Sequence, residues 1–236
     1  MSVEFIPAAD VHALRRRIEE ARQRALDGHG APAAEPQASY WEPLFEANAA
    51  EVLRALPQVQ LAAGYSVRYR FYGQRGRDLL VRPFVARTGT DVDSVRQLLD
   101  WHAPPDSLVA AAAPTQDVAL LYRHFTFCAT ASGVFEYWLA MQELWASARW
   151  AHSHLVASAA ELSQITASEG WDVVQPIAAY EPAVVRGESG ARLAVLLQCP
   201  LGRCEITLQQ IEIGADQALR YGDPVLVARG PKGYLL

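Results

Sequence analysis

The segment of residues 134–165 restricts the fold more than any other stretch, because it belongs to the longest run of the chain without proline or glycine. At about 100° per residue, its apolar residues collect on one broad face and its carboxylates collect opposite. The broad face consists of Trp138, Met141, Trp145, Ala148, His152, Leu155, Ala159 and Leu162. Such an arc is typical of a helix that is covered on most sides. We therefore predict one long central helix, capped by Ser132 and ended by Gly170, against which the other elements pack.

Trp150 and two histidines depart from this helical pattern. Trp150 projects near the polar stripe, so it either lies beneath another segment of the chain or marks a surface for a partner. His152 and His154 could suggest a metal-binding pair, but residues two apart on a helix point about 200° away from each other and cannot share one ion. On a strand the same two rings could do so. Because a helix is expected here, we predict no metal site and no cofactor.

Charge and composition exclude several classes of protein. The net charge is −5, which gives no overall attraction to nucleic acid or to an anionic membrane. The N-terminal residues show no secretory signal, and no segment approaches about 18 consecutive apolar residues, so we expect neither export nor a membrane span. Three cysteines are too few for a disulfide scaffold. All basic residues except Lys232 are arginines, a bias typical of GC-rich bacterial genomes. The sequence thus predicts a bacterial cytoplasmic protein.

Residues 10–27 predict an N-terminal helix that begins at Asp10 and ends before Gly28. Its apolar residues repeat every three or four positions and form one narrow seam on a strongly charged helix. The seam consists of Val11, Leu14, Ile18, Ala21 and Ala25. Residues 28–39 are small residues and prolines without a period, which indicates a linker. We expect the helical arm to dock on the chain itself or, alternatively, on a second copy.

The clearest strand pair lies between residues 65 and 87. Residues 65–72 alternate between apolar or aromatic and polar side chains, which is the period of a half-buried strand. Residues 73–76 predict a turn, and residues 79–87 predict the returning strand. Pro83 cannot donate a hydrogen bond to a ladder, so the returning strand is expected at a sheet edge.

Periodicity and turn residues assign the remaining segments. Residues 40–56 predict a second helix, and residues 90–102 predict a short third one. Residues 120–129 could be a strand or a buried helix, and their aromatic side chains favour a strand. From Trp171 onward, short apolar or alternating runs are separated by glycine-bearing turns. This pattern predicts an antiparallel sheet, a sandwich or a small barrel.

Together these elements predict an α+β fold. In this fold an antiparallel β-sheet or sandwich packs on one long central helix, and an N-terminal helical arm precedes both. We expect three parts: the arm and linker in residues 1–38, an α+β core with the arginine-rich hairpin and the central helix in residues 39–170, and an antiparallel β segment in residues 171–236. The last two parts are expected to pack as one domain.

The best candidate site is the arginine hairpin, residues 64–88. It holds six arginines and one acidic residue, although the chain as a whole is acidic. Arg68 and Arg70 share one strand face and Arg82 is expected across from them, a spacing that suits phosphate, carboxylate or an acidic partner. Tyr72 could add a stacking surface of the kind that nucleic-acid sites use. The alternative is a solvated strand face whose charges discourage aggregation between sheets.

Cys199 and Cys204 flank a short turn whose length decides whether they can form a disulfide. In a four-residue hairpin loop they would face each other, whereas a three-residue loop with a bulge would put them out of register. In a reducing cytoplasm we expect two free thiols. Without further ligands, a pair at this spacing is weak evidence for zinc. The sequence contains no glycine-rich phosphate loop, nucleophile elbow or zinc-protease motif.

Two functional hypotheses follow. The first is a non-catalytic binding or assembly protein that contacts an acidic protein partner through the arginine hairpin, with Trp150 or the arm as further contact surfaces and self-association through the arm as one form of assembly. The second is an enzyme or sensor domain that binds a small anionic ligand, phosphate or carboxylate, through Arg68, Arg70 and Arg82. Nucleic acid is a less suitable partner because the rest of the chain is acidic.

Overall fold

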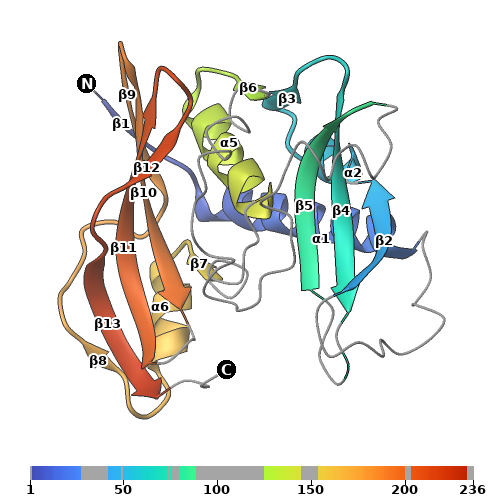
Figure 1. Cartoon of the computed structure of the whole chain (residues 1–236). Helices are drawn as coiled ribbons and strands as arrows, with labels where there is room; N and C mark the ends of the chain where they lie inside the picture. The colour runs from blue at the N-terminus through green and yellow to red at the C-terminus, as the bar shows by residue number, and fades with distance from the viewer. Residues whose placement is uncertain are drawn as a thin grey trace. The chain divides into compact units, whose positions relative to one another are not determined.

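The structure, a computed structural model, describes residues 2–27, 42–48, 50–73, 75, 80–88, 125–144, 154–199 and 203–232. The chain divides into two compact units: unit 1 comprises Met1–Ala13, Cys128–Trp138 and His152–Leu236, and unit 2 comprises Leu14–Phe127 and Leu139–Ala151. Helices α1 (Ala8–Asp27) and α5 (Ala131–Leu144) contribute residues to both units. The fold is mixed α+β with a large curled antiparallel sheet (Figure 1), which confirms the predicted fold class in its coarse form.

The large sheet belongs to unit 1 and has eight strands within the described ranges. Its order is β1-β9-β10-β11-β13-β8; β12 also pairs with β11, β7 also pairs with β10, and every pairing is antiparallel. The strands are β1 (Val3–Phe5), β7 (His154–Val156), β8 (Asp172–Val173), β9 (Ala183–Gly187), β10 (Gly190–Cys199), β11 (Arg203–Gly214), β12 (Leu219–Tyr221) and β13 (Val225–Lys232). The antiparallel β segment predicted from Trp171 onward is therefore confirmed.

The single helix predicted for residues 134–165 is not confirmed, because the segment is split. Helix α5 ends at Leu144, and residues 154–156 form β7, which pairs with β10 in the register Leu196 to Val156. The pairing of β10 with β9 stops at Ala194, so the next residues of β10 need another partner for their backbone groups. β7 supplies it. A short apolar run can satisfy a helical or an extended pattern, and here tertiary pairing decides between them.

Helix α6 (Ala159–Thr166) begins directly after β7 because its first turn is capped. The backbone N–H of Glu161 donates to Oγ of Ser158 at 3.2 Å, and Oε2 of Glu161 accepts from the backbone N–H of Ala157 at 2.6 Å. The first bond satisfies an N–H group that the first turn of a helix leaves without a partner, and the second ties the residue before the cap to that turn. Nδ1 of His12 lies 3.5 Å from Oε1 of Glu161, which brings the start of α1 to the start of α6 within unit 1.

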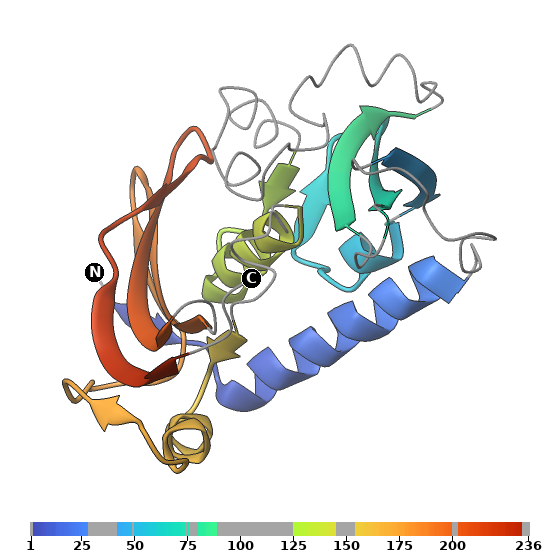
Figure 2. The ribbon, with the colours of Figure 1, turned by 60° about the horizontal axis from the view of Figure 1, so that its bottom comes forward.

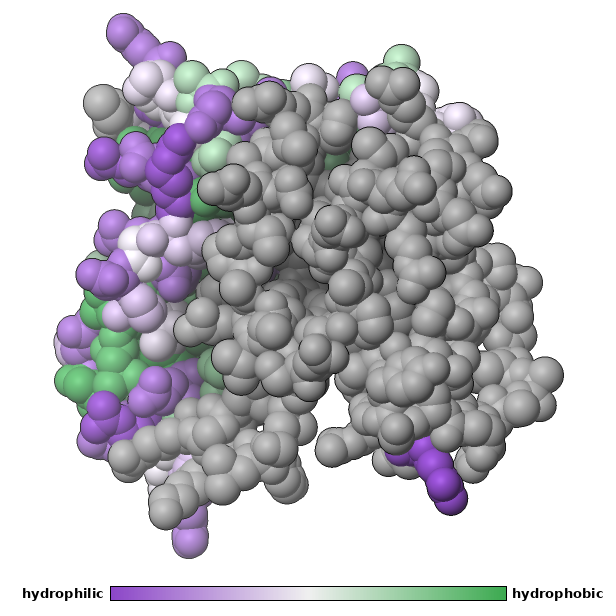
Figure 3. Space-filling view, in the orientation of Figure 1, coloured by the Kyte–Doolittle hydropathy of each residue, from purple (hydrophilic) through white to green (hydrophobic). Residues whose placement is uncertain are grey.

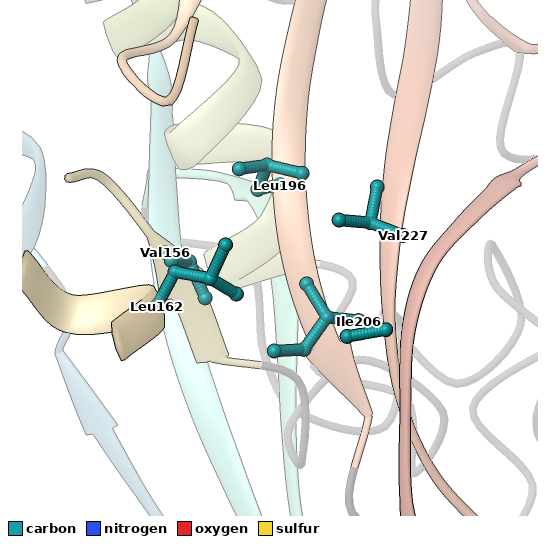
Figure 4. Close-up of a cluster of buried hydrophobic side chains, with 6 residues drawn as sticks. Val156, Leu162, Leu196, Ile206 and Val227 are labelled. Atoms are coloured by element: carbon teal, nitrogen blue, oxygen red, sulfur yellow. The ribbon is translucent and has the colours of Figure 1, made fainter. Parts of the chain in front are cut away.

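A hydrophobic cluster fills the space between α6 and one end of the sheet. Figure 4 shows its side chains coming together from α6, β7, β10, β11 and β13. The buried members are Val156, Leu162, Leu196, Ile206, Val227 and Ala228. Trp171, which follows α6, packs against the cluster from outside and lies on Gly230 of β13. A Cβ atom at position 230 would lie 2.7 Å from the indole ring, so the close approach of Trp171 requires glycine there.

The opposite face of the β10–β11 hairpin is also buried, as the low exposure of Leu193, Val195 and Ile211 shows. The first half of α5 lies beside this part of the sheet in both views (Figures 1 and 2). Oη of Tyr137 on α5 donates a hydrogen bond to the carbonyl oxygen of Gln217 at 2.8 Å. Gln217 lies in the turn between β11 and β12, so this bond ties the helix to the end of the hairpin.

Unit 2 contains, among its described residues, a three-stranded antiparallel sheet of order β2-β4-β5. The strands β4 (Tyr65–Gly73) and β5 (Leu80–Arg87) are the predicted hairpin, and β5 with Pro83 lies at an edge as predicted. The helix predicted for residues 40–56 is wrong. Residues 42–48 form β2 (Glu42–Asn48), which pairs with β4, and only α2 (Ala50–Arg54) is helical. The apolar positions that fit a helical period also fit a strand once β4 offers a ladder to pair with.

A second, two-stranded sheet of unit 2 pairs β3 (Val59–Leu61) with β6 (Phe125–Phe127), which confirms the strand favoured for residues 120–129 over this part. The predicted N-terminal helix is confirmed as α1. All five residues of its apolar seam are buried in the isolated chain, so the arm docks on the chain itself. The predicted linker of residues 28–39 and the predicted helix of residues 90–102 lie outside the described residues.

The predicted division into residues 1–38, 39–170 and 171–236, with the last two parts packed as one domain, stays a prediction. Among the described helices, none combines the length and the apolar character needed to cross a membrane.

Candidate binding surfaces

The backbone register of the arginine hairpin brings most of the predicted site residues together. Arg70 on β4 lies directly opposite Arg82 on β5, and Tyr72 lies two residues further along β4, opposite Leu80. On the other side of β4, Glu46 of β2 is the register partner of Arg70. β4 is thus the middle strand, and a cross-strand row of one acidic and two basic residues crosses it.

The remaining two predicted site residues differ in what the structure says of them. Arg68 lies opposite Phe84, is half-buried, and already takes part in an interaction within the chain. Trp150 lies outside the described residues. The hairpin itself is confirmed, whereas a binding role for Arg68, Arg70, Arg82, Tyr72 and Trp150 stays a prediction.

A groove that the sequence did not indicate lies on the large sheet of unit 1. It has a volume of about 470 Å³, within the range of roughly 300–1,000 Å³ that small-molecule sites occupy. Strands β9, β10, β11 and β12 supply its lining, on the same face of β10 and β11 that α6 covers at their other end. Over unit 1, hydrophobic residues reach the surface among hydrophilic ones (Figure 3).

Two cross-strand rows build the floor of this groove. The first row crosses from β9 to β12, and its successive register partners are Val185, Arg192, Glu212 and Arg220. The second row crosses from β9 to β11, and its register partners are Ala183, Ala194 and Gln210. The floor is therefore apolar towards β9 and charged towards β12.

The three charged residues of the groove are not equivalent. Nη2 of Arg220 donates to Oδ2 of Asp216 at 2.6 Å, so Arg220 has its own counter-charge. The pKa of Asp216 lies below its ordinary value; burial acts to raise it, but the hydrogen bond from Arg220 and its positive charge outweigh that effect. By contrast, the side chains of Arg192 and Glu212 make no ion pair or hydrogen bond with any residue in the described ranges.

Sequence reasoning missed this groove because it depends on register. Arg192 and Glu212 occupy polar positions in alternating runs, which by themselves indicate only solvated strand faces. The two become neighbours because Cys199 lies opposite Glu205, which fixes the register of the whole β10–β11 pair. A slip by one residue would place Arg192 beside a residue of the other face. The alternation was visible in the sequence, but the register was not.

The same register decides the question of the two cysteines. Because Cys199 lies opposite Glu205, Cys204 is one residue out of register with it and belongs to the other face of the pair. All three cysteines are free thiols. The out-of-register alternative therefore holds for Cys199 and Cys204.

The prediction that His152 and His154 cannot share a metal ion assumed a helix, and the strand β7 at His154 removes this geometric reason. His154 lies on β7 with an exposed side chain, and His152 lies outside the described residues. Among the described residues, no group of three histidine, cysteine or acidic side chains could hold a metal ion.

Unit 2 has a hollow of its own between α2, β3 and β4, with a volume of about 410 Å³. Its lining is mainly apolar and includes Leu53, Leu56 and Val59. Its charged residue, Arg54, is exposed and pairs with Glu51 one helical turn before it. Among its described lining residues, the hollow therefore presents no charged group that lacks a counter-charge.

Comparison with known proteins assigns no family to the chain. No protein-family model matches it, and neither a curated protein nor a solved structure does so.

Proposed function

We propose that the protein is a non-catalytic binding or assembly protein of the bacterial cytoplasm that contacts an acidic partner through its arginine hairpin. The observation that carries this proposal is the direct register pairing of Arg70 with Arg82. Like charges in directly opposed positions of an antiparallel pair repel each other and reduce stability. Glu46 is the register partner of Arg70 on the other side, and a row of one acidic and two basic residues has a net positive charge. An anionic group bound over the pair would supply the second counter-charge.

A small anionic ligand is the alternative occupant of the same pair, because one phosphate or carboxylate group can accept hydrogen bonds from two guanidinium groups. In that case the chain is a sensor or enzyme domain rather than an assembly protein. The two alternatives differ in the size of the anion that binds, so the same experiment can separate them.

The test is a titration of the whole chain with poly-L-glutamate, inorganic phosphate and a single-stranded oligonucleotide at low salt, followed by calorimetry. We expect Arg70→Gln with Arg82→Gln to weaken binding of poly-L-glutamate by roughly tenfold, since charge-assisted hydrogen bonds are lost. The matched control is Arg54→Gln with Arg186→Gln, at exposed positions outside both the hairpin and α1, which removes the same charge elsewhere.

Equal losses in the two double variants would mean that only the overall charge matters, and the hairpin would then not be the contact surface. Binding of phosphate alone would favour the small-ligand alternative. Preference for the oligonucleotide would contradict both.

Self-association through the arm is part of the same proposal, but the side of α1 that makes the contact differs from the apolar seam. The apolar seam of α1 is buried within the chain, so a second copy could contact only the charged side of this helix. Light scattering of the whole chain over a range of concentrations tests this. A mass that falls to that of one chain as salt is raised is expected for a contact made by charged side chains.

A further inference from the structure

The groove of unit 1 has an apolar part and a charged part, and this combination suits one class of ligand. Its apolar part continues past β9 onto β1, because Val3 is the register partner of Val185 and Phe5 is the partner of Ala183. The side chains of Val3 and Phe5 are 53% and 52% exposed. Large apolar side chains in the open, next to a groove, are typical of surfaces that bind another molecule. β1, β9 and β10 therefore form an apolar wall.

The charged part of the groove holds two groups that need partners. Arg192 and Glu212 are direct register partners, yet their charged groups lie further apart than the 4.0 Å of an ion pair. Oppositely charged side chains in adjacent positions usually meet, although on a surface the gain is small. Arg220, on the far side of Glu212, is paired with Asp216 instead. One guanidinium and one carboxylate thus lie side by side in the lining of the groove without an ion pair between them.

From this geometry we infer that the groove binds a small zwitterion with an apolar body, of which an apolar α-amino acid is the simplest example. Its carboxylate accepts hydrogen bonds from the guanidinium of Arg192, and its ammonium group donates to the carboxylate of Glu212. Its side chain packs on Val185 and Ala194 and extends towards Phe5. Each part of the ligand thus contacts a different part of the groove.

The inference goes beyond the proposed contact through the arginine hairpin and does not depend on it. The hairpin belongs to unit 2, whereas every described residue that lines the groove belongs to unit 1. The double variant Arg70→Gln with Arg82→Gln should therefore bind the zwitterion as the unaltered chain does. Either proposal can fail while the other stands.

Four small probes test which groups the groove recognises. L-phenylalanine carries both charges and an apolar body; 3-phenylpropionate lacks the ammonium group, 2-phenylethylamine lacks the carboxylate, and glycine lacks the apolar body. NMR titration of the whole chain is expected to show L-phenylalanine binding more tightly than each of the other three by roughly tenfold. For 3-phenylpropionate and 2-phenylethylamine this is the value of one charge-assisted contact, and for glycine it reflects the lost burial of the apolar body. If 3-phenylpropionate binds as well as L-phenylalanine, Glu212 is not a contact and the inference fails.

Variants then locate the binding. Arg192→Gln and Glu212→Gln should each weaken binding of L-phenylalanine by roughly tenfold. Both side chains are exposed, so these variants should keep the melting temperature of the unaltered chain. Arg17→Gln and Glu169→Gln, at exposed positions outside the groove, are the matched controls and should change nothing.

A third variant, Ala194→Leu, keeps both charges but fills the apolar part of the groove. It should also weaken binding, whereas unchanged binding would place the ligand elsewhere. No detectable binding of L-phenylalanine or L-leucine at millimolar concentration would overturn the inference outright.

Discussion

The two ends of one face of the β10–β11 hairpin differ in burial: helix α6 covers one end, and the other end is exposed. At the end under α6, Leu196 and its neighbour Leu197 are both buried, so the alternation of a half-buried strand is lost. At the other end, Arg192 is exposed beside the buried Leu193, and the alternation is kept. The strands and the register are the same at both ends. What differs is the presence of a helix over the face, and this cover decides whether a strand position becomes core or binding surface.

The sharpest way to test this comparison is to remove a side chain at the covered end. Leu196→Ala should lower the free energy of unfolding by about 2–5 kcal/mol, because the surrounding cluster cannot fully close the cavity. Chemical denaturation followed by circular dichroism measures the loss. A loss below about 1 kcal/mol would mean that α6 does not cover this end in solution.

The cover itself can be weakened without touching the cluster. Ser158→Ala removes the cap of α6 and should lower the free energy of unfolding by about 1 kcal/mol. Ser158→Gly should lower it by only a few tenths of that, since glycine leaves the first turn accessible to water. Denaturation midpoints of the two variants provide the measurement. Equal losses would argue against a capping role for the hydroxyl group.

At the open end, removal of a side chain should hardly matter for stability. Arg192→Ala should change the free energy of unfolding by less than about 0.5 kcal/mol, because the side chain is exposed and makes no ion pair among the described residues. The same denaturation experiment applies. A loss comparable to that of Leu196→Ala would erase the distinction between the two ends.

The smallest expected effect on stability is that of the ion pair between Asp216 and Arg220 beside the groove. The pKa of Asp216 is lower in the folded chain than its ordinary value, so ionised Asp216 favours folding at neutral pH and this contribution disappears as the pH falls through the folded pKa. Asp216→Asn should therefore melt slightly below the unaltered chain at neutral pH, and the difference should vanish in strong acid. Thermal melts across that range test the sign. A difference that grows on acidification would contradict the pairing with Arg220.

The parts of the fold that the sequence predicted are those set by local periodicity. The alternation over residues 65–72 and the seam of α1 need no distant partner to be recognised, and both elements appear where predicted. The segment of residues 134–165 failed for the opposite reason. Its apolar arc is compatible with a helix throughout. Residues 154–156 nevertheless form a strand, because they pair with β10, which lies some 40 residues later in the chain.

The candidate sites divide in the same way. The arginine hairpin could be found from sequence because its charges are concentrated within 25 residues. The groove could not, because Arg192 and Glu212 come from different strands and Arg220 from a third. Their meeting depends on the register of two pairings that the residue pattern leaves open. The position of a carboxylate beside a guanidinium, each without an ion partner among the described residues, is a property of the sheet and not of any one strand.

The close approach of Trp171 to Gly230 has a consequence for how this chain can vary. Any side chain at position 230 would collide with the indole ring, and any smaller residue at position 171 would leave a gap above the glycine. Neither position can change by itself without loss. In homologous chains, when they are compared, these two positions should covary, with a bulkier residue at 230 accompanied by a smaller one at 171.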